Sequence, residues 1–211
     1  MSDDVTGNGA PVRLQTERGP IACVYHEGMP GAGGVVFVGG TDGGFDGPAN
    51  GIYAMLAGDL LGHGISSLRL DFRLHVAPGD VEDGTHDVLA GVAFLKRKRA
   101  GRIGLVGHSY GGAVVINAAA LSPDVDAVVT LSTQTAGTSL TPYVAPRPLL
   151  LIHGELDRRL PPACSQYVYE RAGEPKELVI LRGAKHSLRQ RREELRRLSG
   201  TWLVTHLHPA R

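Results

Sequence analysis

The sequence predicts an α/β protein with a mostly parallel central sheet of about eight strands flanked by helices. Short apolar runs, typical of buried parallel strands, alternate along the chain with longer segments in which we expect helices. No internal repeat, low-complexity linker or shift in composition divides the 211 residues. We therefore expect residues 1–211 to form a single domain with a sizeable core.

The expected elements alternate regularly in chain order. Strands are expected at 12–16, 21–25, 35–38, 66–70, 103–107, 127–131, 149–153 and 177–181. Helices are expected at 48–62, 83–98, 110–121, 161–172 and 190–205. The last of these helices carries an apolar stripe that should face the sheet, while its arginines form a solvated face. Residues 1–10 are polar and acidic, and we expect a flexible segment there.

A Gly-x-Ser-x-Gly motif follows the expected strand 103–107 and opens the next helix. In such an elbow a serine lies on a tight, strained turn between a strand and a helix, so small neighbours are needed. Gly107 and Gly111 meet that need, which makes Ser109 the candidate nucleophile. The backbone N–H of Tyr110 lies at the helix N-terminus, where it would stabilise a developing oxyanion.

Two further strand ends carry residues that could complete a catalytic triad in the order serine, acid, histidine. Asp157 follows the apolar run 149–153, and His186 follows the run 177–181. Because the carboxyl ends of parallel strands meet at one edge of a sheet, we expect Ser109, Asp157 and His186 to converge there. Glu155 remains an alternative acid.

A glycine-rich loop follows the expected strand 35–38 and could supply a second oxyanion donor. We assign this donor to the backbone N–H of Thr41, with Asp42 as the alternative. A dinucleotide site is the rival interpretation of such a loop, but the glycines here do not match Gly-x-Gly-x-x-Gly.

These motifs together resemble those of the α/β-hydrolase superfamily over nearly the whole chain. The elbow at Ser109, the strand end His153 to Asp157 and the loop Gly183 to His186 carry the resemblance. The short chain, in which residues 132–148 leave no room for a cap domain, is most similar to small carboxylesterases and dienelactone-hydrolase-like members. Dienelactone hydrolases usually carry a cysteine at the elbow, so Ser109 favours simple ester hydrolysis.

The resemblance implies a serine carboxylesterase that cleaves esters of small or short-chain acids through an acyl-enzyme on Ser109. The same triad would also serve an amidase or a cofactor-free haloperoxidase or perhydrolase, and a non-catalytic ligand-binding protein on this scaffold is a further alternative. We expect no cofactor and no metal. His206 and His208, the closest histidine pair, are expected to belong to a solvated tail.

Composition excludes several other classes of protein. The net charge of +1 indicates neither a nucleic-acid nor a membrane partner. The resemblance implies a small-molecule ester as the substrate, and a homodimer stays open. No apolar run approaches a membrane span, and the polar N-terminus predicts no secretory signal. Cys23 and Cys164 form no Cys-x-x-Cys pair, which favours a reduced, cytoplasmic setting.

Three other positions near the expected site are interpreted as structural. The stretch Asp71 to Arg73 is expected to form a charge pair or a loop clamp. His108 and His153 are expected to pack or to hydrogen-bond beneath the site, without taking the catalytic proton themselves.

Overall fold

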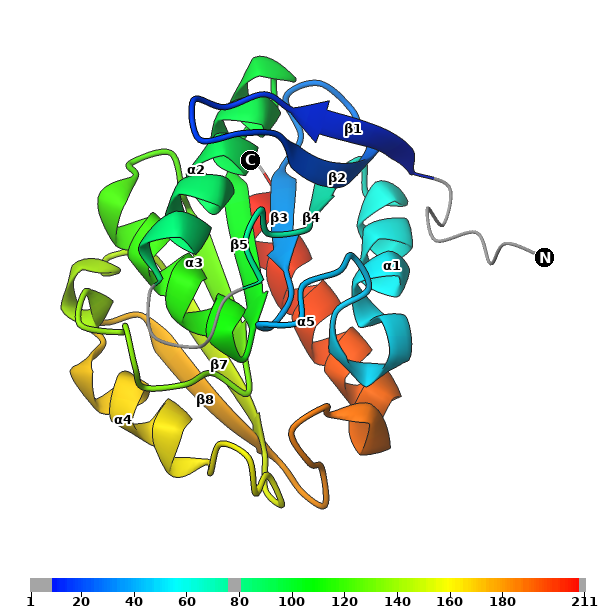
Figure 1. The fold of residues 1–211 in the computed structure, drawn as a ribbon. Helices are drawn as coiled ribbons and strands as arrows, with labels where there is room; N and C mark the ends of the chain where they lie inside the picture. Colours follow the sequence, from blue (N-terminus) through cyan, green and yellow to red (C-terminus); the bar gives the residue numbers. More distant parts are fainter. Residues whose placement is uncertain (1–8, 76–80, 209–211) are drawn as a thin grey trace.

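An eight-stranded sheet runs through the centre of the protein in the order β1-β2-β4-β3-β5-β6-β7-β8 (Figure 1). The computed structural model describes residues 9–75 and 81–208. The strands are β1 (Ala10–Leu14), β2 (Ile21–His26), β3 (Gly34–Val38), β4 (Ser66–Leu70), β5 (Ile103–His108), β6 (Ala127–Leu131), β7 (Leu149–Gly154) and β8 (Lys176–Leu181). β2 pairs antiparallel with β1 and with β4, whereas the other neighbours are parallel, so the predicted mostly parallel sheet is confirmed.

The sheet carries helices on both faces. They are α1 (Pro48–Leu61), α2 (Glu82–Arg97), α3 (Tyr110–Leu121), α4 (Ala163–Arg171) and α5 (Arg192–Leu207), with short 3₁₀ helices η1 (Thr141–Tyr143) and η2 (Arg189–Arg191). Figure 1 shows α1 and α5 together on one side of the sheet and α2, α3 and α4 on the other. The segment 132–148 holds only η1 and loops, which agrees with the expected lack of a cap.

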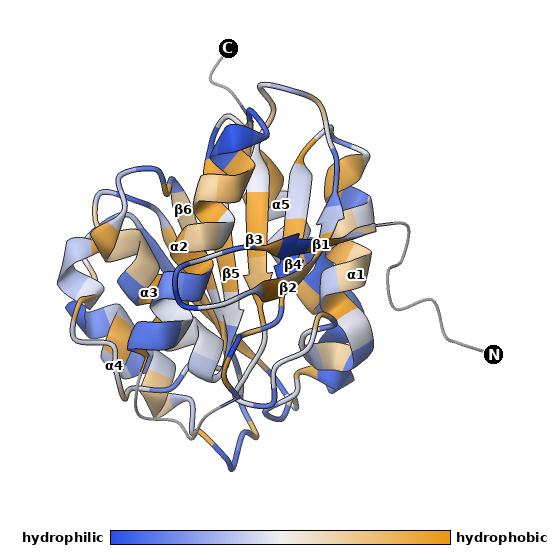
Figure 2. Cartoon of the chain, turned by 45° about the horizontal axis from the view of Figure 1, so that its top comes forward, coloured by the Kyte–Doolittle hydropathy of each residue, from blue (hydrophilic) through white to orange (hydrophobic). Residues whose placement is uncertain are grey.

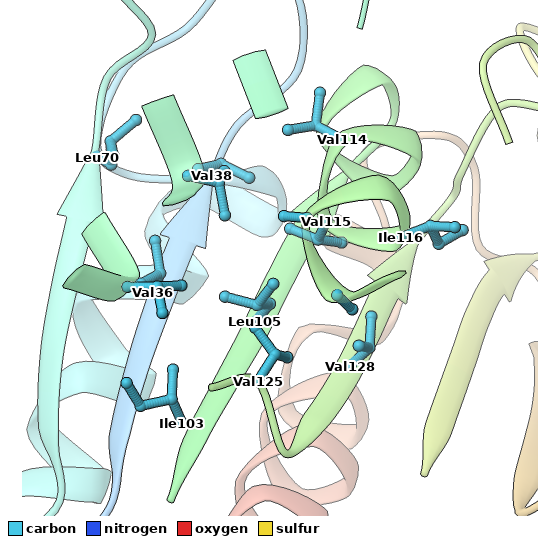
Figure 3. Close-up of a cluster of buried hydrophobic side chains, with 14 of the residues drawn as sticks. Val36, Val38, Leu70, Ile103, Leu105, Val114, Val115, Ile116, Val125 and Val128 are labelled. Carbon is cyan, nitrogen blue, oxygen red and sulfur yellow. The ribbon is translucent and has the colours of Figure 1, made fainter. Parts of the chain in front are cut away.

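Strand alternation divides the core into two apolar layers. Val36 and Val38 point to the layer beneath α2 and α3, as Figure 3 shows, whereas Val35 and Phe37 point to the layer beneath α1 and α5. All four side chains are fully buried. Figure 2 shows that hydrophobic residues run along the central strands, whereas many loops and helix segments around the sheet carry hydrophilic residues. Burial on both faces explains why these strands read as continuous apolar runs.

The first strand differs from its prediction of 12–16, because it begins and ends two residues earlier. Thr16 and Gly19 form the turn that joins β1 to β2, in which the Thr16 hydroxyl donates to the Gly19 carbonyl at 2.6 Å. Thr16 therefore belongs to the turn. Residues 1–8 of the expected flexible segment lie outside the described residues, and Ala10 already belongs to β1.

The strand order reverses between β3 and β5, because β4 lies on the far side of β3 from β5. Loops that leave neighbouring strands in opposite directions open a crevice at the carboxyl edge of the sheet. The loop after β3 and the turn after β5 both begin at this point. The topology thus places the glycine-rich loop beside Ser109.

Hydrogen bonds fix the loop that joins β3 to α1. The hydroxyl of Tyr53 donates to the Val38 carbonyl at 2.8 Å, and the N–H of Ala49 donates to the Ser187 carbonyl at 2.8 Å. Asp71 accepts the N–H of Gly44 at 2.7 Å, which confirms the expected loop clamp. The charge pair expected nearby is also present, as Arg73 binds a carboxylate of α2 at 2.6 Å.

The arginines of α5 take part in packing. Arg196 binds both carboxylate oxygens of Asp59 at 2.6 Å and so joins α5 to α1. Arg192 lies against the sulfur of Met55 in the same helix pair. None of the helices within residues 9–75 and 81–208 has the length and apolar character of a membrane-spanning segment.

Candidate active site

Ser109 has the strained backbone that its motif predicts. Its φ of 55° and ψ of −116° lie in a region that residues with a side chain rarely adopt. Its N–H donates to the Leu131 carbonyl of β6 at 2.8 Å, and its carbonyl accepts the N–H of Gly112 at 3.0 Å. These bonds hold the serine at the end of β5 and at the first turn of α3.

The glycines of the elbow are required by close approach. A Cβ on Gly107 would overlap the backbone of Gly111. A Cβ on Gly111 would overlap the carbonyl of Gly39, which lies in the loop after β3. Backbone atoms cannot move aside as a flexible side chain would. The two glycines therefore let α3 pack directly onto the ends of β3 and β5.

The loops after β7 and β8 bring Asp157 and His186 to Ser109. His186 Nε2 lies 3.2 Å from Ser109 Oγ, and His186 Nδ1 lies 2.7 Å from Asp157 Oδ2. With the proton on Nδ1, the imidazole donates to the carboxylate and accepts the hydrogen of the serine hydroxyl. The structure thus joins the three predicted site residues in one hydrogen-bonded chain.

Asp157 is held ionised by several donors. Its Oδ1 accepts the backbone N–H groups of Arg159 at 2.9 Å and Leu160 at 3.0 Å. Burial acts to raise the pKa of Asp157, but the hydrogen bonds from Leu160 and His186 outweigh burial and place this pKa below its ordinary value. The carboxylate therefore remains available to orient His186.

His153 supplies a second imidazole to the same carboxylate. Its Nε2–H donates to the Leu160 carbonyl at 2.8 Å and lies 3.2 Å from Asp157 Oδ2, while Nδ1 accepts the Ser165 hydroxyl hydrogen at 2.7 Å. Burial lowers the pKa of His153, so the ring stays neutral. The prediction that His153 hydrogen-bonds beneath the site is confirmed. The hydrogen-bond partners of His153 could not be predicted from the sequence, because only the fold places Ser165 beside the ring.

The loops that carry the acid and the histidine touch through their backbones. The N–H of Leu156 donates to the Ala184 carbonyl at 2.8 Å. A Cβ on Gly154 would lie 2.6 Å from that carbonyl oxygen, so a side chain there would push the two loops apart. The short distance between Asp157 and His186 depends on this contact.

His108 lies next to the serine and packs on the candidate base. Its ring centroid lies 4.9 Å from that of His186, and its Nε2–H donates to the His186 carbonyl at 3.2 Å. Burial first, and then the nearby His186, lower the pKa of His108 to about 4. The ring is therefore neutral at neutral pH, and the prediction of a packing role is confirmed.

A pocket of about 180 Å³ opens above these residues. The glycine-rich loop, including Thr41 and Asp42, forms one wall, and Ser109 and His186 lie in the same lining. The structure thus keeps both Thr41 and Asp42 as candidates for the second oxyanion donor. Tyr110, which would supply the first donor, begins α3, and its ring packs edge-on against Phe72 at 5.4 Å.

The other residues considered from the sequence lie elsewhere. Glu155 is exposed and accepts the N–H of Gly183 at 2.8 Å, so Asp157 is the carboxylate that contacts His186. Burial raises the pKa of the Cys164 thiol, and raises that of Cys23 to about 12, which makes both poor nucleophiles. His206 stacks on Trp202 with ring centroids 4.0 Å apart. Within 9–75 and 81–208, no three His, Cys, Asp or Glu side chains are grouped to hold a metal ion.

The comparisons with known proteins agree with the fold. The sequence pattern of the family described as "alpha/beta hydrolase fold" matches residues 24–158, which is more than half of the chain. The protein therefore belongs to the α/β-hydrolase family. No curated protein matches the sequence.

Solved structures share the fold at low sequence identity. A dienelactone hydrolase from Anabaena variabilis is 20% identical with a TM-score of 0.82, and the match covers 95% of this chain and 99% of that one. A serine hydrolase without lid from Xanthomonas campestris is 20% identical with a TM-score of 0.77, with 96% of each chain covered. An esterase domain from Rhodothermus marinus is 19% identical with a TM-score of 0.74, covering 94% and 98%.

Replacing Gly107 with alanine should destabilise the protein by about 2–3 kcal/mol, because the added methyl group overlaps fixed backbone. Gly58, in the last turn of α1, is the matched control, since a Cβ there meets nothing within 4 Å. Gly58→Ala should be neutral or stabilise by up to about 1 kcal/mol through helix propensity. Urea unfolding of both variants measures the difference, and a Gly107→Ala protein as stable as the parent would contradict the packing argument.

The neutral ring of His108 predicts a loss of stability in acid. Its folded pKa of about 4 lies below the ordinary 6.5, so between these values the unfolded chain binds a proton that the folded protein does not. The stability that depends on the neutral His108 ring is complete above pH 6.5 and is lost as the pH falls through about 4. The loss in the free energy of unfolding is at most about 3 kcal/mol. Urea unfolding from pH 7 to 4 should show a smaller decline for His108→Gln. His153 remains in both proteins, so parallel curves would exclude His108 as the cause.

Proposed function

We propose that the protein is a serine hydrolase that cleaves carboxylic esters of small or short-chain acids through an acyl-enzyme on Ser109. The observation that carries this proposal is the hydrogen-bonded chain from Ser109 through His186 to Asp157, with 3.2 Å and 2.7 Å between the bonded atoms. A serine hydroxyl is a weak nucleophile until an adjacent base removes its proton, and this arrangement supplies the base and the group that orients it.

In the proposed reaction each group acts from the position described above. His186 Nε2 takes the proton of Ser109 Oγ as the oxygen attacks the ester carbonyl carbon. The N–H groups of Tyr110 and Thr41 stabilise the resulting oxyanion, and Asp157 stabilises the imidazolium. His186 then gives the proton to the leaving alcohol. Water, deprotonated by the same imidazole, attacks the acyl-enzyme and releases the acid.

The shape of the site supports a small acyl group. The pocket above Ser109 measures about 180 Å³, below the usual size of pockets that enclose a drug-sized ligand. No cap covers it in the segment 132–148, so the remainder of the substrate would stay in solvent. The similarity to an esterase domain and to a dienelactone hydrolase supports the same class of chemistry.

The first test is hydrolysis of p-nitrophenyl acetate, butyrate and octanoate. The rate should be highest for the short acyl groups and should fall by about 10⁶-fold in Ser109→Ala and His186→Ala, because either change removes the proton transfer to the nucleophile. Turnover that persists in Ser109→Ala would contradict the proposal. Ligand-induced stabilisation of the folded parent without acylation of Ser109 would instead favour a binding protein.

Turnover of amides, or of peroxide as the acyl acceptor, would assign the same triad to an amidase or to a perhydrolase. These reactions share the acyl-enzyme with ester hydrolysis and differ in the leaving group or in the acceptor. The Ser109→Ala variant is therefore the control for each of them.

The second test concerns the acid. Asp157→Asn should lower kcat by about 10⁴-fold, because an amide stabilises neither the imidazolium nor the tautomer that accepts the serine proton. Glu155→Gln is the matched control, since its carboxylate contacts the N–H of Gly183 and not His186. Its rate should stay within about twofold of the parent. A larger loss of kcat in Glu155→Gln than in Asp157→Asn would instead identify Glu155 as the acid of the triad.

A further inference from the structure

We infer that the preferred esters carry a second, free carboxylate, and that the guanidinium of Arg159 binds it beside the scissile carbonyl. This inference rests on the proposed function and adds a class of substrate to it. The binding site consists of one cationic side chain at the rim of the pocket that holds Ser109 and His186.

The backbone of Arg159 is fixed relative to the triad. Its N–H donates to Asp157 Oδ1 at 2.9 Å, and the next N–H, of Leu160, donates to the same oxygen at 3.0 Å. The carboxylate that orients His186 therefore also sets the position from which the Arg159 side chain leaves the loop. The backbone of Arg159 thus keeps its distance from the nucleophile as long as the triad is assembled, and the exposed side chain extends from this fixed point.

Arg159 belongs to the lining of the pocket that holds the nucleophile. Arg159 lies in the lining together with Thr41, Asp42, Ser109 and His186, and no other lysine or arginine of the described residues does so. Its positive charge also contributes to the lowered pKa of His108, whose ring borders the same pocket.

No carboxylate of the described residues neutralises Arg159. The ion pairs present in residues 9–75 and 81–208 involve other arginines, such as Arg73, Arg102 and Arg196. Asp42 lines the same pocket from the loop after β3, but it forms no ion pair with Arg159 among these residues. A substrate carboxylate would be repelled by Asp42 and attracted by Arg159, which directs it to the rim after β7.

The geometry of a guanidinium and a carboxylate determines how strongly anionic esters should be preferred. A guanidinium binds a carboxylate through two parallel N–H···O bonds, and such charge-assisted bonds are stronger than those to a neutral amide. Arg159 is exposed, so solvent weakens the pair. We expect a preference in kcat/KM of about tenfold for an anionic ester over a neutral ester of the same shape.

The neighbouring Arg158 provides a matched control. It is exposed on the same loop and carries the same charge, but it does not line the pocket. A general effect of net charge would appear equally in Arg158→Gln and Arg159→Gln. A specific contact with the substrate would appear only in Arg159→Gln.

The experiment measures kcat/KM by pH-stat titration for two pairs of esters. Monomethyl glutarate and methyl glutaramate differ only in a carboxylate on the acyl side. The pair 4-acetoxybenzoate and 4-acetoxybenzamide differs in the same way on the alcohol side. The parent should prefer the anion by about tenfold in at least one pair, which also identifies the side of the ester that faces Arg159. Arg159→Gln should reduce that preference to less than about twofold, whereas Arg158→Gln should keep it.

Each outcome separates this inference from the proposed function. A parent that hydrolyses p-nitrophenyl acetate without preferring either anionic ester would overturn the inference and leave the serine hydrolase intact. A preference that survives in Arg159→Gln would also overturn it. A folded parent that hydrolyses neither these esters nor p-nitrophenyl acetate would overturn the proposed function, and the inference with it.

Discussion

The close approach of α3 to the ends of β3 and β5 is the constraint on which the site depends. Ser109 adopts a φ of 55° only because its N–H is bonded to β6 and because Gly107 and Gly111 carry no side chain. Strain of this kind is retained where the surrounding structure fixes the backbone, and here α3 is buried along most of its length. The apolar core therefore stabilises the backbone geometry that exposes the serine.

Two other loops reach the serine through backbone contacts of their own. The contact of Leu156 with Ala184 joins the acid loop to the histidine loop, and the bond from Ala49 to Ser187 joins the histidine loop to the segment after β3. Three loops from distant parts of the chain thus brace one another around the pocket. Since each bond uses main-chain atoms, the side chains that line the pocket can vary without loss of this support.

The ionisable groups around His186, the candidate base, differ in charge. Asp157 is kept ionised by donors, whereas His108, which packs on His186, and His153, which contacts Asp157, are kept neutral by burial. These neutral rings add no fixed positive charge that would oppose the protonation of His186 during the reaction. The cation that does line the pocket, Arg159, lies at the rim, where a proposed substrate carboxylate would meet it.

The sequence alone determined the alternation of strands and helices, the elbow at Ser109, and the chain positions of Asp157 and His186. These features are local: apolar runs, glycine spacing and strand ends are readable because neighbouring residues define them. The sequence did not give the correct bounds of the first strand, because these depend on the turn at Thr16 and Gly19. The tertiary structure decided the antiparallel pairing of β2, the second imidazole on Asp157, and the presence of Arg159 in the pocket. Each of these joins residues through contacts between separate strands and loops, and such contacts are set by the packing of the whole sheet.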